Sequence, residues 1–554
     1  MANIELGEMT PTTRVGGALR VTTAFTLPLT LWLISAAWGV WIAYDRSAAW
    51  NRFWLMLGGL ALYALLARLP ERIRFTQHRE APVFQWILLL LPVLVTVYFV
   101  LTNDWSARLG KVAWLDPAMR WFASWQPNLA TIRLNSNSVG GILAMLIPLQ
   151  VAAWQRAQPH GRRWLGIPFV GISLAGLVLC ASRGGWLALA FVMAGWAVWS
   201  VTGQLAHRWG VSPQTTKIIP LIAIALLLVA TVSFAVLTPW GERLLSLRSD
   251  RLEVWRNSLD LVSDYPFTGL GLDNFEMAYS SYTLLVHVGH TIHAHNLFLD
   301  IWLNQGPLGV LALAGLIVQA LWPQKAASTW RAAGLAALAV LLLHGLLDDA
   351  FYGYGGQALP MLLVPFAALD RPGAKAKPIP VLGLWGITAC ALAIALTLPS
   401  VRATVEANLG ALAQTQAELS IYTNARYGLQ EALRRSPQLD LSKALGHYQA
   451  ALTLDRANAT ANRRVGQIEL SLGQYGPACK HLETAFAAAP HQRAARQMLG
   501  ECDALAGDIS QATALWQTIN LNEGQLDVRY SWYAYLGEKE SAARISQAAQ
   551  GLHK

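Results

Sequence analysis

Charged residues are scarce in this chain of 554 amino acids. Asp, Glu, Lys and Arg together make up 13% of the residues, whereas hydrophobic residues make up 54%. Soluble proteins normally carry about 25% charged residues, so this composition argues against an ordinary soluble enzyme. Tryptophan is abundant, with 24 residues, many of them at the ends of apolar runs. Because an indole ring has a polar edge and favours the headgroup zone of a bilayer, the pattern indicates a membrane protein.

Cysteine is also scarce, with four residues. Cys180 and Cys390 lie in apolar runs, whereas Cys479 and Cys502 lie in the C-terminal region and could pair there, although sequence alone leaves their pairing open. The net charge of +10 could suggest a nucleic-acid partner. The excess of basic residues lies between the apolar runs, however, where such residues set membrane topology. We therefore predict no nucleic-acid partner.

Apolar runs long enough to cross a bilayer, which takes about 20 residues, recur through the first 400 residues. The candidate spans are 21–44, 53–69, 83–101, 137–154, 165–181, 184–201, 217–237, 295–321, 332–348, 356–369 and 379–399. We expect the first to be an uncleaved anchor and the short segment 356–369 to be tilted or re-entrant. The predicted fold is all-α, a polytopic membrane domain of about 11–12 spans over residues 1–399, with a large outer loop at 238–294.

Basic residues between the apolar runs predict the orientation. They gather in alternate loops, which the positive-inside rule places in the cytoplasm together with the N-terminus. The loop 238–294, the turn at Arg183 and everything after residue 400 then lie outside. We thus expect a multi-pass protein of the cytoplasmic (inner) membrane with an extracytoplasmic, or periplasmic, tail. The result depends on the span count, and a miscount at 356–369 would reverse the tail.

The C-terminal region shows an internal repeat. Ala444, Ala478 and Ala512 are 34 residues apart, which is the period of tetratricopeptide (TPR) helix pairs. We expect a helical connector over residues 400–439 and a soluble, TPR-like α-helical repeat domain over residues 440–554. Helical repeats stack into extended surfaces that bind partners, so the domain is predicted to hold a protein partner.

Arginines stand out in the outer loop, where the positive-inside rule gives no reason to place them. Arg248, Arg251 and Arg256 could be solvated residues of a loop helix, or they could clamp phosphate, because a guanidinium group binds phosphate oxygens through paired hydrogen bonds. Arg183 lies at an outer membrane edge, where an arginine needs a partner or a role. Together with Gly184 and its open backbone amides, it is a second candidate for anion binding.

Histidines crowd the end of the same loop at His287, His290, His293 and His295. A metal site is one interpretation, since imidazole is a common ligand. A single catalytic histidine is the other, and His295 is the best candidate because it opens a predicted span and could take a proton from an acceptor hydroxyl. His295 and Asn296 could also simply cap the helix that follows.

Two adjacent acids, Asp348 and Asp349, lie at the outer end of another predicted span. They could orient a base or bind sugar hydroxyls, or they could form a solvated turn. The candidate substrate-binding residues are Arg248, Arg256, Asn296, His293, Asp348 and Asp349.

In their order and spacing across roughly residues 130–370, these motifs resemble the O-antigen ligase and polymerase superfamily of GT-C-type membrane glycosyltransferases. The pieces that carry the resemblance are Ser182-Arg183-Gly184-Gly185, Arg251-x-x-x-Trp255, Pro266-x-x-Gly269-x-Gly271-x-x-x-Phe275, and His295-Asn296 before a span that contains Gly306. A trailing tetratricopeptide domain also occurs among relatives.

The resemblance implies transfer of a glycan from an undecaprenyl-diphosphate carrier to an acceptor hydroxyl. The reaction would use no metal or other cofactor and would invert the anomeric carbon. Arg183 and Arg251 would bind the diphosphate and stabilise the leaving group, and His295 would act as general base. A ligase would use lipid A core or a protein as acceptor, whereas a polymerase of the same superfamily would extend a growing chain. A bicarbonate-like transporter is an alternative from another class, although it would place charges at the bilayer midplane rather than at the outer edges.

Overall fold

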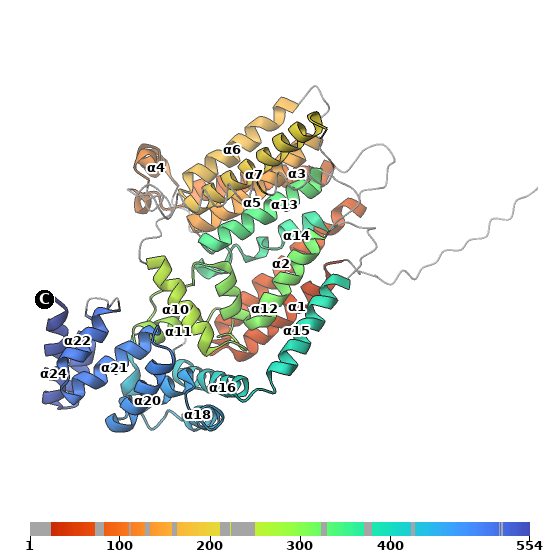
Figure 1. Cartoon of the computed structure of the whole chain (residues 1–554). Helices are drawn as coiled ribbons and strands as arrows, with labels where there is room; N and C mark the ends of the chain where they lie inside the picture. The colour runs from red at the N-terminus through yellow and green to blue at the C-terminus, as the bar shows by residue number, and fades with distance from the viewer. Residues whose placement is uncertain are drawn as a thin grey trace, which may run out of the picture.

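The protein is described here as a computed structural model. It describes residues 24–72, 82–109, 112–127, 133–157, 163–210, 222, 250–322, 329–370, 379–422, 427–519, 521 and 524–553. Helices dominate these residues (Figure 1), and the two strands among them have two residues each. The predicted fold class, a helical membrane protein with a C-terminal helical region, is confirmed.

Apolar helices form a bundle in the first part of the chain. Its longer helices are α1 (Thr26–Ile42), α2 (Arg46–Arg72), α3 (Pro82–Thr102), α5 (Ser136–Ala157), α6 (Ile167–Leu179), α7 (Arg183–Arg208), α12 (Leu297–Leu321), α13 (Thr329–Leu347) and α15 (Ile379–Ala395). Short segments between them are η1 (Ser106–Arg108), η2 (Ala113–Leu115), α4 (Asp116–Trp125) and η3 (Arg163–Gly166).

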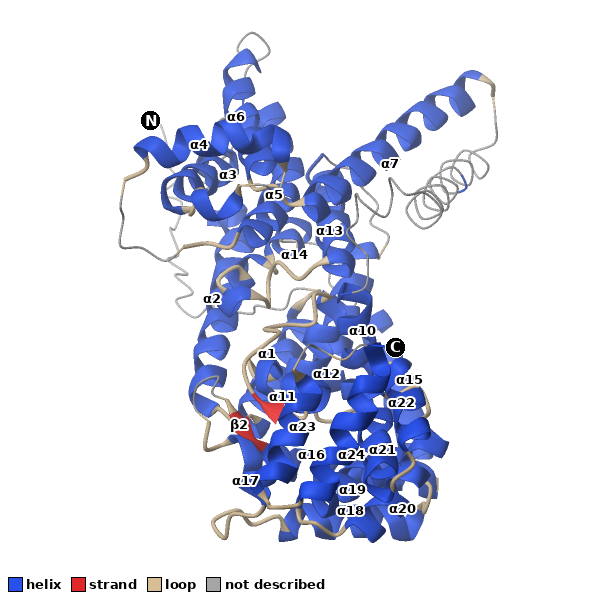
Figure 2. Ribbon diagram, turned by 90° about the vertical axis from the view of Figure 1, so that its left-hand side faces the viewer, coloured by secondary structure: helices blue, strands red, loops and turns tan. Residues whose placement is uncertain are grey.

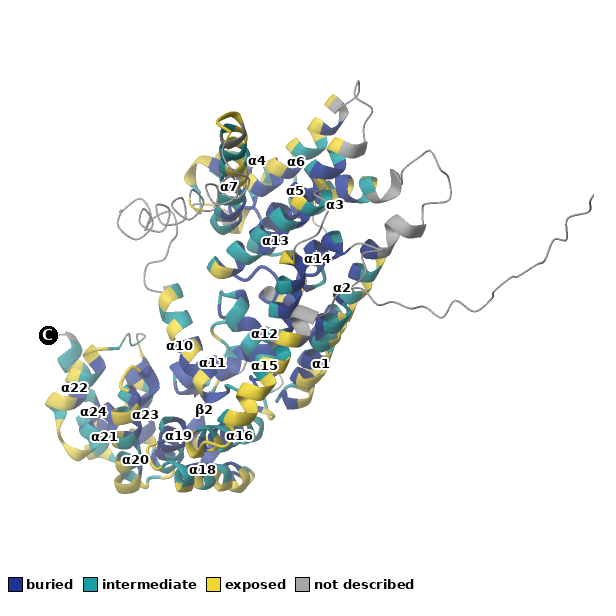
Figure 3. Ribbon diagram, turned by 45° about the vertical axis from the view of Figure 1, so that its right-hand side comes forward, coloured by how far each residue is buried: buried dark blue, intermediate teal, exposed yellow. Residues whose placement is uncertain are grey.

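Helix α5 is the centre of the bundle, because α3, α6, α7 and α13 all pack against it. Its residues from Ser138 to Gln150 are all buried. Close packing is possible because the helix has no side chain at Gly140 and Gly141, where a Cβ atom would meet Ser182 and Ala350 at 2.3 and 2.6 Å. On the outside of the bundle the burial is reversed (Figure 3): α15 is apolar but almost entirely exposed, which is expected of a face that meets lipid.

Five helices of the described residues are long and apolar enough to cross a membrane, or six if the bent pair of α15 and α16 counts as one span. The five lie at Gln85–Thr102, Ser136–Gln155, Arg183–Leu205, Leu297–Leu321 and Thr329–Leu347. Shorter apolar helices lie at Thr26–Ile42, Ile167–Leu179 and Leu359–Leu369. The predicted span 217–237 lies outside the described residues, except for Ile222. The chain is therefore a multi-pass membrane protein.

The doubtful segment 356–369 is broken into short turns rather than one helix. It contains the end of η4 (Tyr354–Gly356), then η5 (Leu359–Met361) and α14 (Val364–Leu369), which pack against α2 and α13. A stretch from 359 to 369 rises only about 16 Å at 1.5 Å per residue, roughly half the thickness of the hydrocarbon core. Counting spans is therefore a weak guide to the side on which the tail lies.

The glycine motif of the outer loop fastens that loop to the bundle. Gly269 and Gly271 have φ angles of +71° and +98°, which glycine adopts without steric cost. A Cβ atom on Gly269 would lie 2.7 Å from the Trp302 carbonyl of α12, and one on Gly271 would lie 2.6 Å from Cα of Ala43. The motif thus lets backbone pack directly on backbone at the C-terminal end of α1 and in the first half of α12.

Two helices of the loop, α10 (Asp250–Asp264) and α11 (Phe275–Thr283), lie between the bundle and the tail (Figure 1). Strand β1 (Val286–His287) follows them and pairs antiparallel with β2 (Gly428–Leu429) of the tail. The tail contains α16 (Pro399–Leu419), α17 (Gln430–Arg434), α18 (Ser442–Leu454), α19 (Ala459–Ser471), α20 (Tyr475–Ala488), α21 (Arg493–Ala506), α22 (Ile509–Gln517), α23 (Gln525–Tyr535), α24 (Lys539–Gln550) and η6 (Gly551–His553).

Tail helices pack in successive pairs (Figure 2), among them α19 with α20, α21 with α22 and α23 with α24. The alanines that repeat every 34 residues are buried, and the glycines of the paired helices follow the same spacing. A Cβ atom on Gly466 would meet Leu482, and one on Gly500 would meet Trp516. Each pair therefore needs a small residue opposite a large one. The assignment to the tetratricopeptide family and the domain boundaries stay predictions.

Candidate active site

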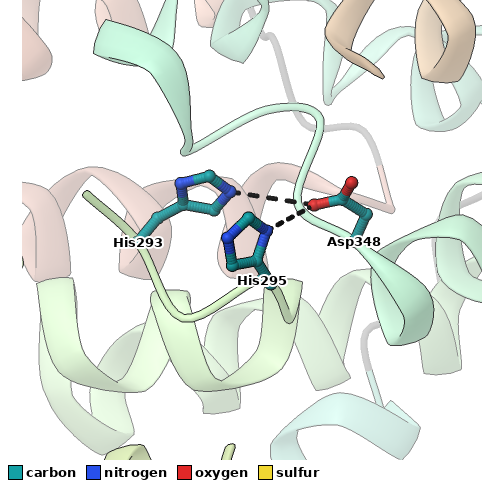
Figure 4. A group of neighbouring side chains, drawn as sticks. All are labelled: His293, His295 and Asp348. Atoms are coloured by element: carbon teal, nitrogen blue, oxygen red, sulfur yellow. Dashed lines mark hydrogen bonds and ion pairs between the residues drawn. The ribbon is translucent and has the colours of Figure 1, made fainter. Parts of the chain in front are cut away.

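The carboxylate of Asp348 is the hub of a cluster at the C-terminal end of α13. Its Oδ1 atom lies 2.9 Å from Nδ1 of His295 and 3.7 Å from Nε2 of His293. Both imidazole rings face the carboxylate (Figure 4). Its Oδ2 atom accepts hydrogen bonds from Nδ2 of Asn137 at 2.8 Å and from Arg251 at 3.3 Å. Four side chains from three other parts of the chain thus converge on one acid.

Electrostatics keep this acid ionised. Burial alone would raise the pKa of Asp348, whose side chain is 4% exposed. The close contacts of His293 and His295 and the charge of Arg251 act the other way and hold the pKa well below its usual range. The surroundings therefore favour the charged form of the carboxylate beside the His295 ring.

The backbone places His295 at the start of α12. Its φ angle is +52°, an unusual conformation for a residue with a side chain. The next residue, Asn296, caps α12, because its Oδ1 atom accepts the amides of Phe298 and Leu299 at 3.0 and 3.2 Å. The predicted helix cap is thus confirmed for Asn296. The His295 carbonyl in turn accepts a hydrogen bond from Nε1 of Trp255 at 3.2 Å.

Arg251 links α10 to the end of α13. Besides its contact with Asp348, it donates to the carbonyl of Leu347 at 2.7 Å. A cation is favourable at the C-terminus of a helix, where free carbonyls concentrate negative charge. The side chain is nevertheless 28% exposed.

Arg183 lies at the same end of the bundle. It begins α7, and a Cβ atom on the adjacent Gly184 would lie 3.4 Å from the ring of His344 and 3.9 Å from Cβ of Leu347, both in α13. Asp348 follows Leu347 directly. The structure therefore brings the start of α7 beside the helix end that holds the acid, and the Arg183 side chain is partly exposed there.

Other predicted site residues have different surroundings. Arg256 lies on the exposed side of α10, and Arg248 lies outside the described residues. Asp349 is fully buried and accepts the amides of Phe351 and Tyr352 at 2.8 and 2.9 Å, as a residue that shapes a turn does. His287 packs at the junction with the tail, where its Nδ1 atom is 2.8 Å from Oγ of Ser281.

The cluster has the composition of a metal site. One ligand atom from each of His293, His295 and Asp348 lies within 4.8 Å of the others. Two histidines and a carboxylate are a common ligand set for zinc. Asp348 is 53 residues from His295 along the chain, so the sequence alone does not show that this carboxylate lies beside the histidines. The metal interpretation is thus stronger in the structure than in the sequence.

Sequence reasoning missed two residues of this region. Asn137 follows Asn135 and Ser136 at the start of an apolar span, and such a polar cluster was a usable signal. His344 is buried one helical turn before Asp348, and neither ring nitrogen has a hydrogen-bond partner among the described residues. The spacing of four residues, which puts two side chains on one face of a helix, could have identified it.

Fold and site together define a class: a multi-pass helical membrane protein in which the ionisable Asp, His and Arg side chains of this cluster gather at the ends of spans. Residues 168–314 match the family model described as O-antigen ligase, so the chain carries an O-antigen ligase family domain. Comparison with curated proteins and with solved structures found no significant match.

The matched region runs from α6 into α12 and includes Arg183, Arg251 and His295, but it ends before Asp348. It also excludes the whole tail. An O-antigen ligase family domain implies transfer of a glycan from a lipid carrier to an acceptor, and therefore glycosyltransferase activity.

Proposed function

We propose that the protein transfers a glycan from an undecaprenyl-diphosphate carrier to an acceptor hydroxyl at the outer face of the cytoplasmic membrane, with His295 as general base. One observation carries the proposal: the 2.9 Å contact between Nδ1 of His295 and the ionised carboxylate of Asp348. An ionised acid can only accept at this contact, so in the neutral ring Nδ1 holds the proton and Nε2 has a free lone pair. A ring held in this way is prepared to take a proton.

In the proposed step, the acceptor oxygen forms a bond to the anomeric carbon while the bond from that carbon to the diphosphate oxygen breaks. The hydroxyl proton moves to Nε2 of His295, and undecaprenyl diphosphate leaves with the electron pair. Negative charge grows on the leaving group, and Arg183 and Arg251 would stabilise it through charge-assisted hydrogen bonds. Asp348 stabilises the imidazolium that forms. The step inverts the anomeric carbon and uses no metal.

Two observations support an outer location. The tail and the Arg/His loop lie on one side of the membrane, since β1 and β2 pair directly. The tail also contains a disulfide between Cys479 and Cys502, whose Cα atoms are 5.6 Å apart. Disulfides persist in oxidising compartments outside the cytoplasm. Both agree with the orientation predicted from the basic loops.

The acceptor distinguishes a ligase from a polymerase. Lipid A core or a protein hydroxyl would make the protein a ligase, and a growing chain would make it a repeat-unit polymerase. Product length separates these reactions, because a ligase attaches one preformed glycan whereas a polymerase yields a ladder. Because helical repeats bind partners, we favour a ligase whose repeat domain holds a protein acceptor or an assembly partner.

The test is a transfer assay with purified protein, a diphosphate-lipid-linked glycan and candidate acceptors, measuring release of undecaprenyl diphosphate. We expect His295→Ala to abolish turnover and Arg183→Ala or Arg251→Ala to reduce it strongly. Arg256→Lys, which keeps the positive charge at an exposed candidate substrate-binding position on α10, should lower turnover less than any of these substitutions. Full activity in His295→Ala would end the general-base proposal.

A metal-dependent mechanism is the alternative favoured by the His293, His295 and Asp348 group. It predicts loss of turnover after chelation and recovery when Zn²⁺ is added back. Our proposal predicts unchanged turnover in excess chelator. The two mechanisms therefore separate in one experiment on the wild-type protein.

A further inference from the structure

Helix α10 joins the site to the tail. Its first turn carries Arg251, which contacts Asp348, and its last residue is Asp264. The two positions are 13 residues apart, so a straight helix separates them by about 20 Å. Trp255, one turn after Arg251, holds the His295 carbonyl at 3.2 Å. The position of α10 thus determines where Arg251 lies and, through Trp255, affects where His295 lies.

The far end of α10 is held by α19 of the tail. Asp264 is completely buried and accepts hydrogen bonds from Arg463, from Arg464 at 2.9 Å and from Oγ1 of Thr460 at 2.9 Å. Burial alone would raise the pKa of Asp264, but the two arginines hold it below its usual value. Arg464 also donates to the hydroxyl of Tyr265, the next residue, at 2.8 Å.

Further contacts from the tail follow the length of α10. Arg493 lies 3.7 Å from Glu253, two residues after Arg251, and also donates to the carbonyl of Thr283 at the end of α11. His491 lies 3.5 Å from Asp260 in the second half of the helix. Tail residues therefore contact α10 near both of its ends.

We propose that the tail is a clamp that positions Arg251, and that Asp264, Arg463, Arg464 and Thr460 are positioning residues of the transferase. The inference rests on the proposed function, in which Arg251 stabilises the leaving group. Its physical reason is geometric: a displacement of about 1 Å at a charged group in an active site can lower turnover about 100-fold. A tail that only recruited an acceptor would not need buried ion pairs to the loop.

The first test compares Arg464→Ala with Arg496→Ala. Arg496 is a tail arginine whose hydrogen bonds go to backbone carbonyls of the tail at Pro490 and Thr518, so it is a matched control. We expect Arg464→Ala to lower kcat about 10- to 100-fold at little cost in donor KM, and Arg496→Ala to leave kcat within twofold. Arg464→Lys, which keeps the charge, should recover part of the loss.

Combination with Arg251→Ala distinguishes positioning from general damage. If the clamp acts through Arg251, Arg464→Ala should cause no further loss of turnover in a protein that already lacks the Arg251 side chain. An equal loss with and without Arg251 would overturn the proposal. Thr460→Val removes one hydrogen bond to Asp264 with little change of shape, so it provides the same comparison if Arg464→Ala fails to fold.

Amide hydrogen exchange tests the clamp independently of glycan transfer. We expect the amides of α10, including those at its Arg251 end, to exchange faster in Arg464→Ala than in wild type or Arg496→Ala. Unchanged exchange there would overturn the clamp even if turnover falls. If the wild-type protein shows no turnover but Arg464→Ala still speeds exchange in α10, the proposed function is refuted and the clamp is retained.

Discussion

Replacing Asp348 by asparagine is expected to remove most of the activity without unfolding the protein. The amide keeps the size of the acid but carries no charge. Its oxygen can still accept hydrogen bonds, but its nitrogen can only donate them. Asp348 accepts from His295, Arg251 and Asn137, so the amide leaves at least one of these donors unpaired. Where the amide nitrogen faces His295, Nδ1 must accept a hydrogen bond, so the ring proton moves to Nε2 and His295 can no longer act as the general base.

The magnitude follows from the contacts. Hydrogen bonds to charged groups contribute about 1.5–3 kcal/mol each. Loss of the contacts to His295 and Arg251 in the transition state therefore amounts to about 3–6 kcal/mol, or roughly 10²- to 10⁴-fold in kcat, at about 1.4 kcal/mol per factor of ten. Donor KM should change less, because the imidazolium and the leaving-group charge develop only in the transition state.

The assay is the initial rate of undecaprenyl diphosphate release by purified Asp348→Asn, with Asp104→Asn as the control. Asp104 forms an exposed ion pair with Arg133 on another loop, where its carboxylate is 41% exposed, and should be dispensable. Thermal melting checks that both variants fold. A rate for Asp348→Asn within threefold of wild type would refute the Asp–His assignment.

Three further predictions concern the loop and the tail. Burial lowers the pKa of His287 from 6.5 to about 4, so as the pH falls the unfolded state takes up a proton on this ring before the folded state does. The free energy of unfolding should therefore fall by up to about 3 kcal/mol between pH 7 and pH 4. His287→Gln should make the melting temperature less dependent on pH across that range. Reduction of the disulfide between Cys479 and Cys502, which are 23 residues apart, should destabilise the tail by roughly 3 kcal/mol, seen as a lower melting temperature in dithiothreitol. Gly500→Ala should cost about 1–3 kcal/mol by overpacking, because the new Cβ atom would lie 2.4 Å from Nε1 of Trp516; an unchanged melting temperature would contradict this.

The sequence indicated the class of fold and several site residues, because both depend on local patterns. Apolar runs and belts of tryptophan follow from the bilayer, and an Asn before a span is a helix cap wherever it occurs. What the sequence could not indicate was which of these residues meet. Asp348 pairs with His295 and Asn137 only because α5, α12 and α13 pack with their ends together. When helix packing brings the residues of a site together, the spacing of those residues along the chain does not show which side chains will be in contact.

The side of the membrane on which the tail lies is better argued from contacts than from a count of spans. A count depends on the broken segment 356–369, whereas the loop and the tail are joined by paired strands and by the buried contacts of Asp264. These contacts require both parts on the same side, whatever the number of spans. If the tail faced the cytoplasm, His295 and Arg251 would face it too, the disulfide would lie in a reducing compartment, and the basic loops would lie outside, against the positive-inside rule. An outer location satisfies all of these constraints at once, and a cysteine-labelling reagent that cannot cross the membrane would test it at an engineered cysteine in place of the exposed Ser510.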